Sequence, residues 1–160
     1  MNAAKINFKI LKNFDNELVD KIYSLEKENL GIDAALNQWQ IPVLIRYGRF
    51  IIIETDKKEI IGVCQILRCW HDFKDAFIHS FYIKSEFRSL GIGGRFLKYI
   101  IDILIKEGFE RIKLTVDPEN IHAIKLYKKE GFKIINLLKD EYGKGLDRYM
   151  MQLNLVSKVK

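Results

Sequence analysis

The sequence has few of the residues that divide or cross-link a chain. Its 160 residues include two prolines, Pro42 and Pro118, and no proline-rich or low-complexity stretch. The two cysteines, Cys64 and Cys69, are too few for a disulfide framework, and their odd spacing in one expected strand sends their side chains to opposite faces. We therefore expect a single domain over residues 1–160 that folds without cross-links.

Long apolar runs are also missing. The longest, residues 99–105, is interrupted by Asp102 and is far shorter than the roughly 20 residues that cross a bilayer. No charged, apolar and small-residue pattern of a secretory signal is seen at the N-terminus. The three histidines lack the spacing of zinc ligands. These absences predict a cytoplasmic protein with neither a membrane segment nor a metal site.

The charge balance is moderately basic. Lysine and arginine number 27 against 21 acidic residues, a net charge of +6 that suits nucleic acid, a phosphorylated cofactor or an acidic surface. The basic residues are scattered, with only short pairs such as Lys57–Lys58 and Lys128–Lys129. A dispersed excess is typical of a solvated surface, so nucleic acid is not the expected partner.

Hydrophobic periodicity predicts alternating strands and helices. The expected strands are 6–10, 49–55, 59–70, 75–83, 111–116, 132–138 and 149–155. The expected helices are 16–29, 34–47, 95–107 and 121–130, the second kinked or split by Pro42. This order predicts an α/β (α+β) fold built on a mixed sheet.

The stretch FRSLGIGGRF, residues 87–96, gathers three glycines just before an expected helix. Glycine in a helix interior costs about 1 kcal/mol relative to alanine, so three of them indicate close approach of the backbone to a ligand. A strand, a glycine-rich turn and a helix together present N–H groups and the positive end of a helix dipole. An anion such as a phosphate group is the expected ligand.

Three phosphate-binding motifs have glycines in such a place. A Walker loop needs Gly-Lys followed by serine or threonine, which the chain does not contain. Residues 91–96 lack the third glycine of a dinucleotide fingerprint, and residues 84–90 separate them from the preceding strand. The third motif, R-x-x-G-x-G/A, accounts for Arg88 as well as for the glycines.

That third motif resembles the cofactor signature of the GNAT superfamily of acetyl-CoA-dependent N-acetyltransferases. In FYIKSEFRSLGIGGRFL, Arg88, Gly91 and Gly93 match its fixed positions, while Ser85 and Ser89 stand where proline and glycine are commoner. A second block, VDPENIHAIKLYKKEGF, resembles the family's V-x-x-x-N-x-x-A-x-x-L-Y-x-x-x-G-F. Its matching residues are Val116, Asn120, Ala123, Leu126, Tyr127, Gly131 and Phe132.

The resemblance implies one N-acetyltransferase domain of the GNAT fold. Such a fold has a mixed, mostly antiparallel sheet with helices on both faces and a central splayed strand pair, and it often pairs as a homodimer. The implied cofactor is acetyl-CoA, with its thioester arm on the strand before the glycines and its pyrophosphate on the loop. The residues implied to bind it are Phe81, Tyr82, Ile83, Arg88, Ser89, Leu90, Gly91, Ile92, Gly93, Gly94, Asn120 and Tyr127.

The second block supplies two side chains near the reaction. Asn120 and Tyr127 are two helical turns apart and are expected on one face. The resemblance implies that Asn120 lies beside the cofactor and that Tyr127 is the general acid for the departing thiolate. A phenol of pKa about 10 can protonate a thiolate whose acid has a pKa of about 8.5 once the C–S bond has broken. The alternatives are a helix cap for Asn120 and an aromatic packing role for Tyr127.

The general base is predicted at His79. Related diamine and polyamine acetyltransferases often carry a glutamate four residues before the strand end, here Ile83. A histidine of pKa about 6.5 could take the ammonium proton directly or through water. The alternative is a histidine hydrogen-bonded within the sheet. Losing a fixed carboxylate here also weakens any expectation of a polyamine acceptor.

The resemblance places the acceptor pocket among the first two helices, the turn after the third strand and the last strand connection. The expected lining residues are Glu28, Asp33, Trp39, Trp70, His71, Asp72 and Tyr142, of which Trp39, Trp70, His71 and Tyr142 are the predicted substrate-binding residues. We predict direct acetyl transfer to a primary amine of a small molecule or protein, since both cysteines lie outside the motifs. The alternatives are transfer of a longer acyl group and an acyl-CoA-binding regulatory module without turnover.

Overall fold

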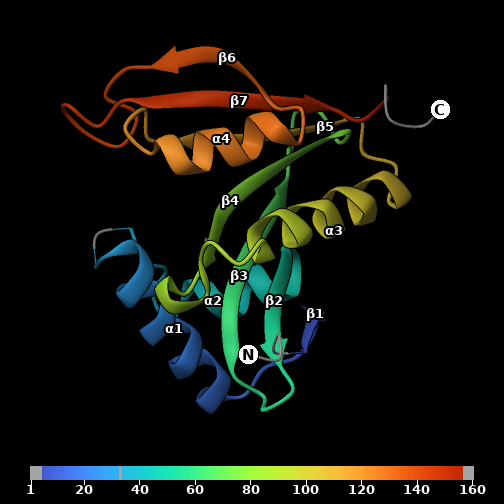
Figure 1. Ribbon diagram of the computed structural model, residues 1–160, viewed down its shortest axis with the longest axis vertical. Coiled ribbons are helices and arrows are strands. Elements are labelled where there is room, and N and C mark those ends of the chain that lie inside the picture. Colours follow the sequence, from blue (N-terminus) through green and yellow to red (C-terminus); the bar gives the residue numbers. More distant parts are fainter. Residues whose placement is uncertain (1–4, 33, 157–160) are drawn as a thin grey trace. The chain divides into compact units, whose positions relative to one another are not determined.

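The computed structural model describes residues 5–32 and 34–156 (Figure 1). Its strands are β1 (Ile6–Leu11), β2 (Arg49–Thr55), β3 (Ile60–Arg68), β4 (Asp75–Ile83), β5 (Arg111–Val116), β6 (Lys133–Leu138) and β7 (Arg148–Asn154). Its helices are α1 (Asn16–Leu30), α2 (Gln40–Tyr47), α3 (Ile92–Lys106) and α4 (Ile121–Lys129), with a 3₁₀ turn at η1 (Ser85–Phe87). Over these residues, no helix combines the length and apolar character needed to cross a membrane.

The strands form one seven-stranded sheet in the order β1-β2-β3-β4-β5-β7-β6. The pairings β1–β2, β2–β3, β5–β7 and β6–β7 are antiparallel, whereas β4 and β5 are parallel. The parallel register runs from Asp75–Arg111 to Ile78–Leu114, although β4 continues to Ile83 and β5 to Val116. This sheet confirms the predicted fold class, and the register of its central pair, β4 and β5, ends before either strand does.

Three predicted boundaries were wrong by two residues or more. Strand β3 ends at Arg68 rather than at residue 70, so Cys69 lies just beyond it. Helix α2 begins at Gln40, with Pro42 in its first turn, where a missing N–H donor costs nothing and no kink is needed. Helix α3 begins at Ile92, so the last glycines of the loop belong to its first turn.

The chain divides into two compact units, the first comprising residues 1–67 and 80–93 and the second residues 68–79 and 94–160. In the first unit, α1 and α2 supply apolar side chains to one buried cluster with β1, β2 and β3. Asp15 caps α1 by accepting a hydrogen bond from the Leu18 amide at 2.8 Å. The helix then buries Val19 and Ile22, each a gain of about 1.5–3 kcal/mol over leaving it exposed.

In the second unit, α3 and β5 show the two periodicities of buried elements. Phe96, Ile100 and Leu104 recur at i, i+4 on α3, and each is at most 1% exposed. On β5 every second residue is buried, so that the strand has one core face and one more exposed face. Burial therefore follows the apolar pattern of the sequence in both elements.

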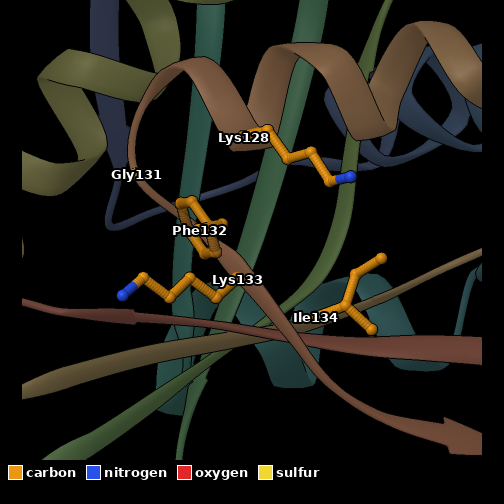
Figure 2. A pocket seen from close by; sticks show the side chains of 5 residues that line it. All are labelled: Lys128, Gly131, Phe132, Lys133 and Ile134. Carbon is orange, nitrogen blue, oxygen red and sulfur yellow. The ribbon is translucent and has the colours of Figure 1, made fainter.

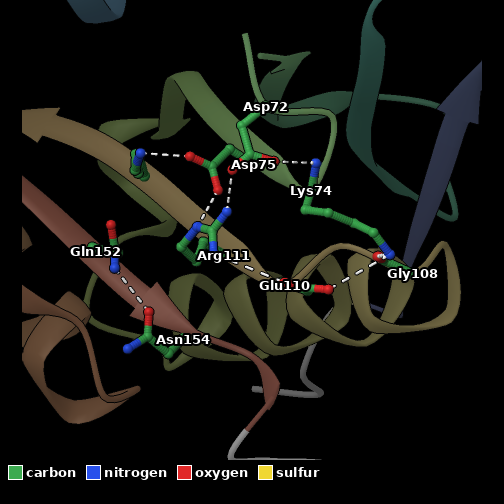
Figure 3. Close-up of polar contacts among 9 residues, drawn as sticks. Asp72, Lys74, Asp75, Gly108, Glu110, Arg111, Gln152 and Asn154 are labelled. Carbon is green, nitrogen blue, oxygen red and sulfur yellow. Dashed lines mark hydrogen bonds and ion pairs between the residues drawn. The ribbon is translucent and has the colours of Figure 1, made fainter. Parts of the chain in front are cut away.

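A network of ion pairs fastens the start of β4 to β5 (Figure 3). The carboxylate of Asp75, which is 3% exposed, contacts Arg111 and Lys113 on β5. Arg111 also pairs with Asp72 in the turn before β4. Desolvation alone raises the pKa of Asp75, but the hydrogen bonds and charges of Lys113 and Arg111 outweigh it and lower this pKa. Asp75 is therefore ionised in the folded protein and binds both cations.

We predict that Asp75→Asn lowers the free energy of unfolding by about 1.5–3 kcal/mol at pH 7, the range for hydrogen bonds to charged groups. Because the folded-state pKa of Asp75 is depressed, its contribution is fully present above the unfolded pKa of about 3.9. It is lost as the pH falls through the folded value. Urea unfolding of both proteins at several pH values measures this difference.

The control is Asp102→Asn on the exposed side of α3, which should leave the unfolding free energy nearly unchanged at every pH. A stability difference for Asp75→Asn that persists undiminished well below pH 3 would contradict an ionic role for this carboxylate.

Candidate functional site

The glycine-rich loop is a left-handed turn that opens α3. Ser89 has φ of +62° and Gly91 has φ of +74°, both in the region that favours glycine. This conformation explains why glycine is the commoner residue at the position of Ser89. No atom lies within 4 Å of the place where a Cβ on Gly91 would stand, and residues 88–91 are exposed. The turn therefore leaves its backbone open to a ligand at the start of a 15-residue helix.

The side chain of Arg88 holds this turn in place through two hydrogen bonds. Its Nε donates to the Ile83 carbonyl at 2.8 Å, and its Nη2 donates to Asn29 Oδ1 at 3.3 Å. The first bond ties the loop to the end of β4, and the second ties it to α1. The sequence predicted a cofactor contact for Arg88 but gave no sign of this bracing role.

The end of β4 carries the other predicted cofactor-binding residues of the first unit. Tyr82 and Ile83 are buried and Phe81 is half-buried. These residues lie beyond Ile78, where the register with β5 ends. The Lys84 amide donates to the Ile61 carbonyl on β3 at 2.9 Å, and its ammonium pairs with Glu59 at 2.7 Å. The strand end is thus held on its β3 side.

In the second unit, Asn120 is the N-cap of α4. Its Oδ1 accepts from the Ala123 amide at 3.1 Å, which is the capping interaction expected as an alternative. Asn120 therefore precedes the helix instead of lying within it, and it is exposed. The capping bond occupies only one of its polar atoms, so its amide nitrogen is left to other uses.

Tyr127 lies on α4 and is 6% exposed. Its ring is 5.7 Å from the ring of Phe132, and its carbonyl accepts from the Phe132 amide at 3.0 Å. The predicted packing role is therefore present in the structure. It fixes the ring, as a proton donor with a defined direction also requires.

His79 lies on β4, and its side chain is exposed. Desolvation by the surrounding protein lowers the pKa of the imidazole from its ordinary value. The neutral ring is therefore the dominant form at neutral pH. This is the form that can accept a proton.

Most side chains predicted to line the acceptor pocket are exposed. Trp39 at the start of α2 is 86% exposed, and Trp70 after β3 is 82% exposed, with its ring 5.8 Å from Phe73. His71 and Glu28 are also exposed. Asp33 lies outside the described residues. Exposed aromatic rings without a core role remain consistent with ligand contacts.

Two other predicted lining residues have partners in the second unit. Asp72 is committed to the ion pair with Arg111. The Tyr142 hydroxyl lies 3.0 Å from Thr115 Oγ1 on β5, and the guanidinium of Arg148 lies 5.3 Å from the centre of its ring. These contacts fix Tyr142 in the loop between β6 and β7.

One buried polar residue was missed in the sequence. Glu26 on α1 is fully buried, and its carboxyl accepts hydrogen bonds from the Leu36 amide and the Gln65 side chain. Desolvation raises the pKa of this carboxyl. A signal was available, because Glu26 follows Ile22 at i+4 on the apolar face of α1. A glutamate in that position needs a buried partner.

A surface hollow in the second unit lies at the end of α4 and the start of β6. It is lined by Lys128, Gly131, Phe132, Lys133 and Ile134, none of which is a predicted site residue. Figure 2 shows the ammonium groups of Lys128 and Lys133 pointing away from one another. Because its two cations do not converge, the hollow does not resemble an anion-binding site.

Comparison with known proteins agrees with the motifs. Residues 16–132 match the model of the acetyltransferase (GNAT) family. The L-methionine sulfoximine/L-methionine sulfone acetyltransferase of Pseudomonas aeruginosa is 26% identical over 130 residues, covering 78% of this chain and 76% of that protein.

Solved structures with the same fold are similarly named. The ribosomal-protein-S18-alanine N-acetyltransferase from Escherichia coli superposes with a TM-score of 0.78 over 94% of each chain at 16% identity. A GNAT family acetyltransferase from Elizabethkingia anophelis with acetyl-CoA bound gives a TM-score of 0.73 at 18% identity, covering 93% of this chain and 97% of that one. From its family match over both motif blocks, this chain belongs to the acetyltransferase (GNAT) family and is an acetyl-CoA-dependent N-acetyltransferase.

Proposed function

We propose that the protein transfers an acetyl group directly to a primary amine, and that the acceptor amine is the α-amino group of an amino acid or a polypeptide. The open left-handed turn at the start of α3 carries the first part of this proposal. The second part is supported by the relatives, whose names refer to L-methionine derivatives and to an alanine of a ribosomal protein.

The turn fits the diphosphate of the cofactor. Backbone N–H groups from Ser89 to Gly94 would bind its oxygens, aided by the positive end of the α3 dipole. Gly91 matters because its exposed backbone has no side chain to keep an anion away. Arg88 would act here chiefly by holding the turn through its bond to the Ile83 carbonyl.

The end of β4 suits the thioester arm. Phe81, Tyr82 and Ile83 lie beyond Ile78, where the register with β5 ends, so the edge of β4 that faces β5 is where an extended ligand would form hydrogen bonds. Acetyl-CoA supplies the activated acetyl group. A backbone N–H near Tyr82 or Ile83 would polarise the acetyl carbonyl and stabilise the charge that develops on its oxygen.

The remaining roles concern protons. Tyr127 Oη would donate a proton to the leaving sulfur, and the packing of its ring on Phe132 would hold it in one direction. His79, kept neutral by its lowered pKa, would accept the proton of the ammonium directly or through water. Asn120 would contribute its amide nitrogen beside the cofactor while its oxygen caps α4.

The acceptor would lie against exposed aromatic and polar side chains. Trp39, Trp70, His71 and Tyr142 carry this part of the proposal, because exposed aromatic rings offer contact area at low conformational cost. Free amino acids and polypeptide N-termini present the same α-amino group to the enzyme. They are therefore two sources of one acceptor chemistry.

The first test is ligand-dependent thermal stability with acetyl-CoA, NAD and ATP at millimolar concentration. A ligand at about 100 times its Kd stabilises the folded state by about 2.7 kcal/mol, or about 5–11 °C for a domain of this size. We expect a shift with acetyl-CoA alone. Thiol release is then measured with L-methionine sulfone, an N-terminal alanine peptide and spermidine. If none of the three amines causes thiol release, the result favours the regulatory alternative. If spermidine is the only amine that does so, the result contradicts the proposed acceptor class.

A second prediction places the diphosphate. Gly91→Glu should weaken acetyl-CoA binding by at least about tenfold, or 1.4 kcal/mol, because a carboxylate at the turn repels the anion. The matched control is Gly108→Glu, since Gly108 has φ of +80° and equally open space and therefore the same backbone strain. Titration calorimetry on both folded variants decides the point. Equal affinities in the two would move the diphosphate site away from the turn.

A third prediction tests the general acid. Tyr127→Phe keeps the ring on Phe132 but removes the hydroxyl, so kcat should fall by about 10²–10⁴ while the Kd of acetyl-CoA changes little. The measurement is steady-state turnover of the best amine beside binding of the cofactor. An unchanged kcat would remove Tyr127 from the mechanism and leave it as a packing residue.

A further inference from the structure

Glu26 is a fully buried carboxyl in the first unit, held between α1, the segment before α2, and β3. Its Oε2 accepts from the Leu36 amide at 3.2 Å, and its Oε1 accepts from Gln65 Nε2 at 2.8 Å. The Tyr82 hydroxyl on β4 also interacts with the carboxyl, without reaching the geometry of a standard hydrogen bond. Three neutral donors from three different segments therefore converge on one side chain.

A buried carboxyl of this kind is costly. Desolvation raises the pKa of Glu26, and the hydrogen bonds from Leu36 and Gln65 together with the nearby Tyr82 hydroxyl only partly oppose it. Among the described residues, those that shift the pKa of Glu26 include no cation. Removing a carboxylate from water without a cationic partner costs several kcal/mol. Stability alone therefore gives little reason for a glutamate here.

The segment that contains the donor Leu36 is held by a hydrogen bond at each residue from 36 to 40. Asn37 Oδ1 accepts from the amides of Trp39 and Gln40, each at 3.0 Å, and the Asn37 amide donates to Gln40 Oε1 at 3.0 Å. The Gln38 side chain donates to Asp20 on α1 at 2.8 Å. Leu36 itself is 5% exposed, yet Trp39 is 86% exposed. An ordered segment that turns its largest apolar side chain to solvent is built to present that side chain.

We propose that Glu26 is a positioning residue for acetyl transfer, whose carboxyl fixes the segment 36–39 so that Trp39 is presented to the amine substrate. The role rests on the proposed function, because Trp39 is taken as part of the acceptor site. Glu26 touches neither substrate nor cofactor, and it acts through the Leu36 amide. Its required property is therefore the reach of the side chain, not its charge.

Two conservative variants separate reach from charge. Glu26→Asp keeps the charge but withdraws the carboxyl by one methylene, about 1.5 Å, which breaks the bond to Leu36. Glu26→Gln keeps the reach and loses the charge. Its oxygen can still accept from Leu36, and its amide can donate to Gln65 Oε1 once the Gln65 side-chain amide turns over, since that oxygen is now buried without a hydrogen-bond partner. Both variants keep a polar group at this buried position, so both are expected to fold.

The experiment combines hydrogen exchange with kinetics. Exchange of the Leu36 amide should be slow in the wild type and in Glu26→Gln, and at least about tenfold faster in Glu26→Asp. For the α-amino probe that the wild type acetylates, Glu26→Asp should raise the KM at least about fivefold with a smaller change in kcat. The Kd of acetyl-CoA should stay within about twofold in all variants. Glu17→Asp and Glu17→Gln, on the exposed face of α1 with a side chain 76% exposed, are the matched controls.

Each result decides the proposal. Loss in Glu26→Asp with rescue in Glu26→Gln supports it. Loss in Glu26→Gln with activity in Glu26→Asp overturns it in favour of a role for the charge, and wild-type behaviour of both overturns it outright. If the wild type acetylates no amine, the proposed function fails, while unchanged exchange of the Leu36 amide in Glu26→Asp would refute the anchoring itself.

Discussion

The short parallel register between β4 and β5 is the constraint on which the rest of the site depends. The two strands pair only from Asp75–Arg111 to Ile78–Leu114, and the ion pairs of Asp75 with Arg111 and Lys113 secure the start of that register. Beyond it, β4 keeps its extended conformation to Ile83. The backbone groups of a strand in the middle of a sheet normally form hydrogen bonds to both neighbouring strands. The last residues of β4 lie beyond the register with β5, and this is where we propose that the thioester arm binds.

The loop between β4 and α3 depends on an unusual backbone conformation. Positive φ values at Ser89 and Gly91 turn the chain so that α3 can begin at once, and Arg88 fixes the turn from its other side. Serine tolerates the left-handed region less readily than glycine, at a cost of about 1–2 kcal/mol. The hydrogen bonds of Arg88 to Ile83 and Asn29 hold the turn and offset this strain.

Buried polar groups in the first unit show where stability has been given up. Glu26 is fully buried with neutral donors, and Gln65, Ser80 and Tyr82 each bury a polar atom without a hydrogen-bond partner. Such groups are rare in cores because each forfeits its hydration. Here they lie on α1, on β3 and on the end of β4, and those on β4 are close in the sequence to the residues of the proposed cofactor arm. Functional sites are where a fold departs from its most stable packing.

The sequence by itself determined the order of the elements, the exact span of β4 and the two motif blocks, because periodicity and glycine placement are local properties. Tertiary structure decided that α3 begins within the glycines, that Arg88 braces the turn, and that Glu26 is buried against Leu36 and Gln65. Those outcomes depend on which segments meet through space. Asn29 and Arg88, or Glu26 and Gln65, become partners only once α1 has packed on the sheet, and no local pattern records that choice.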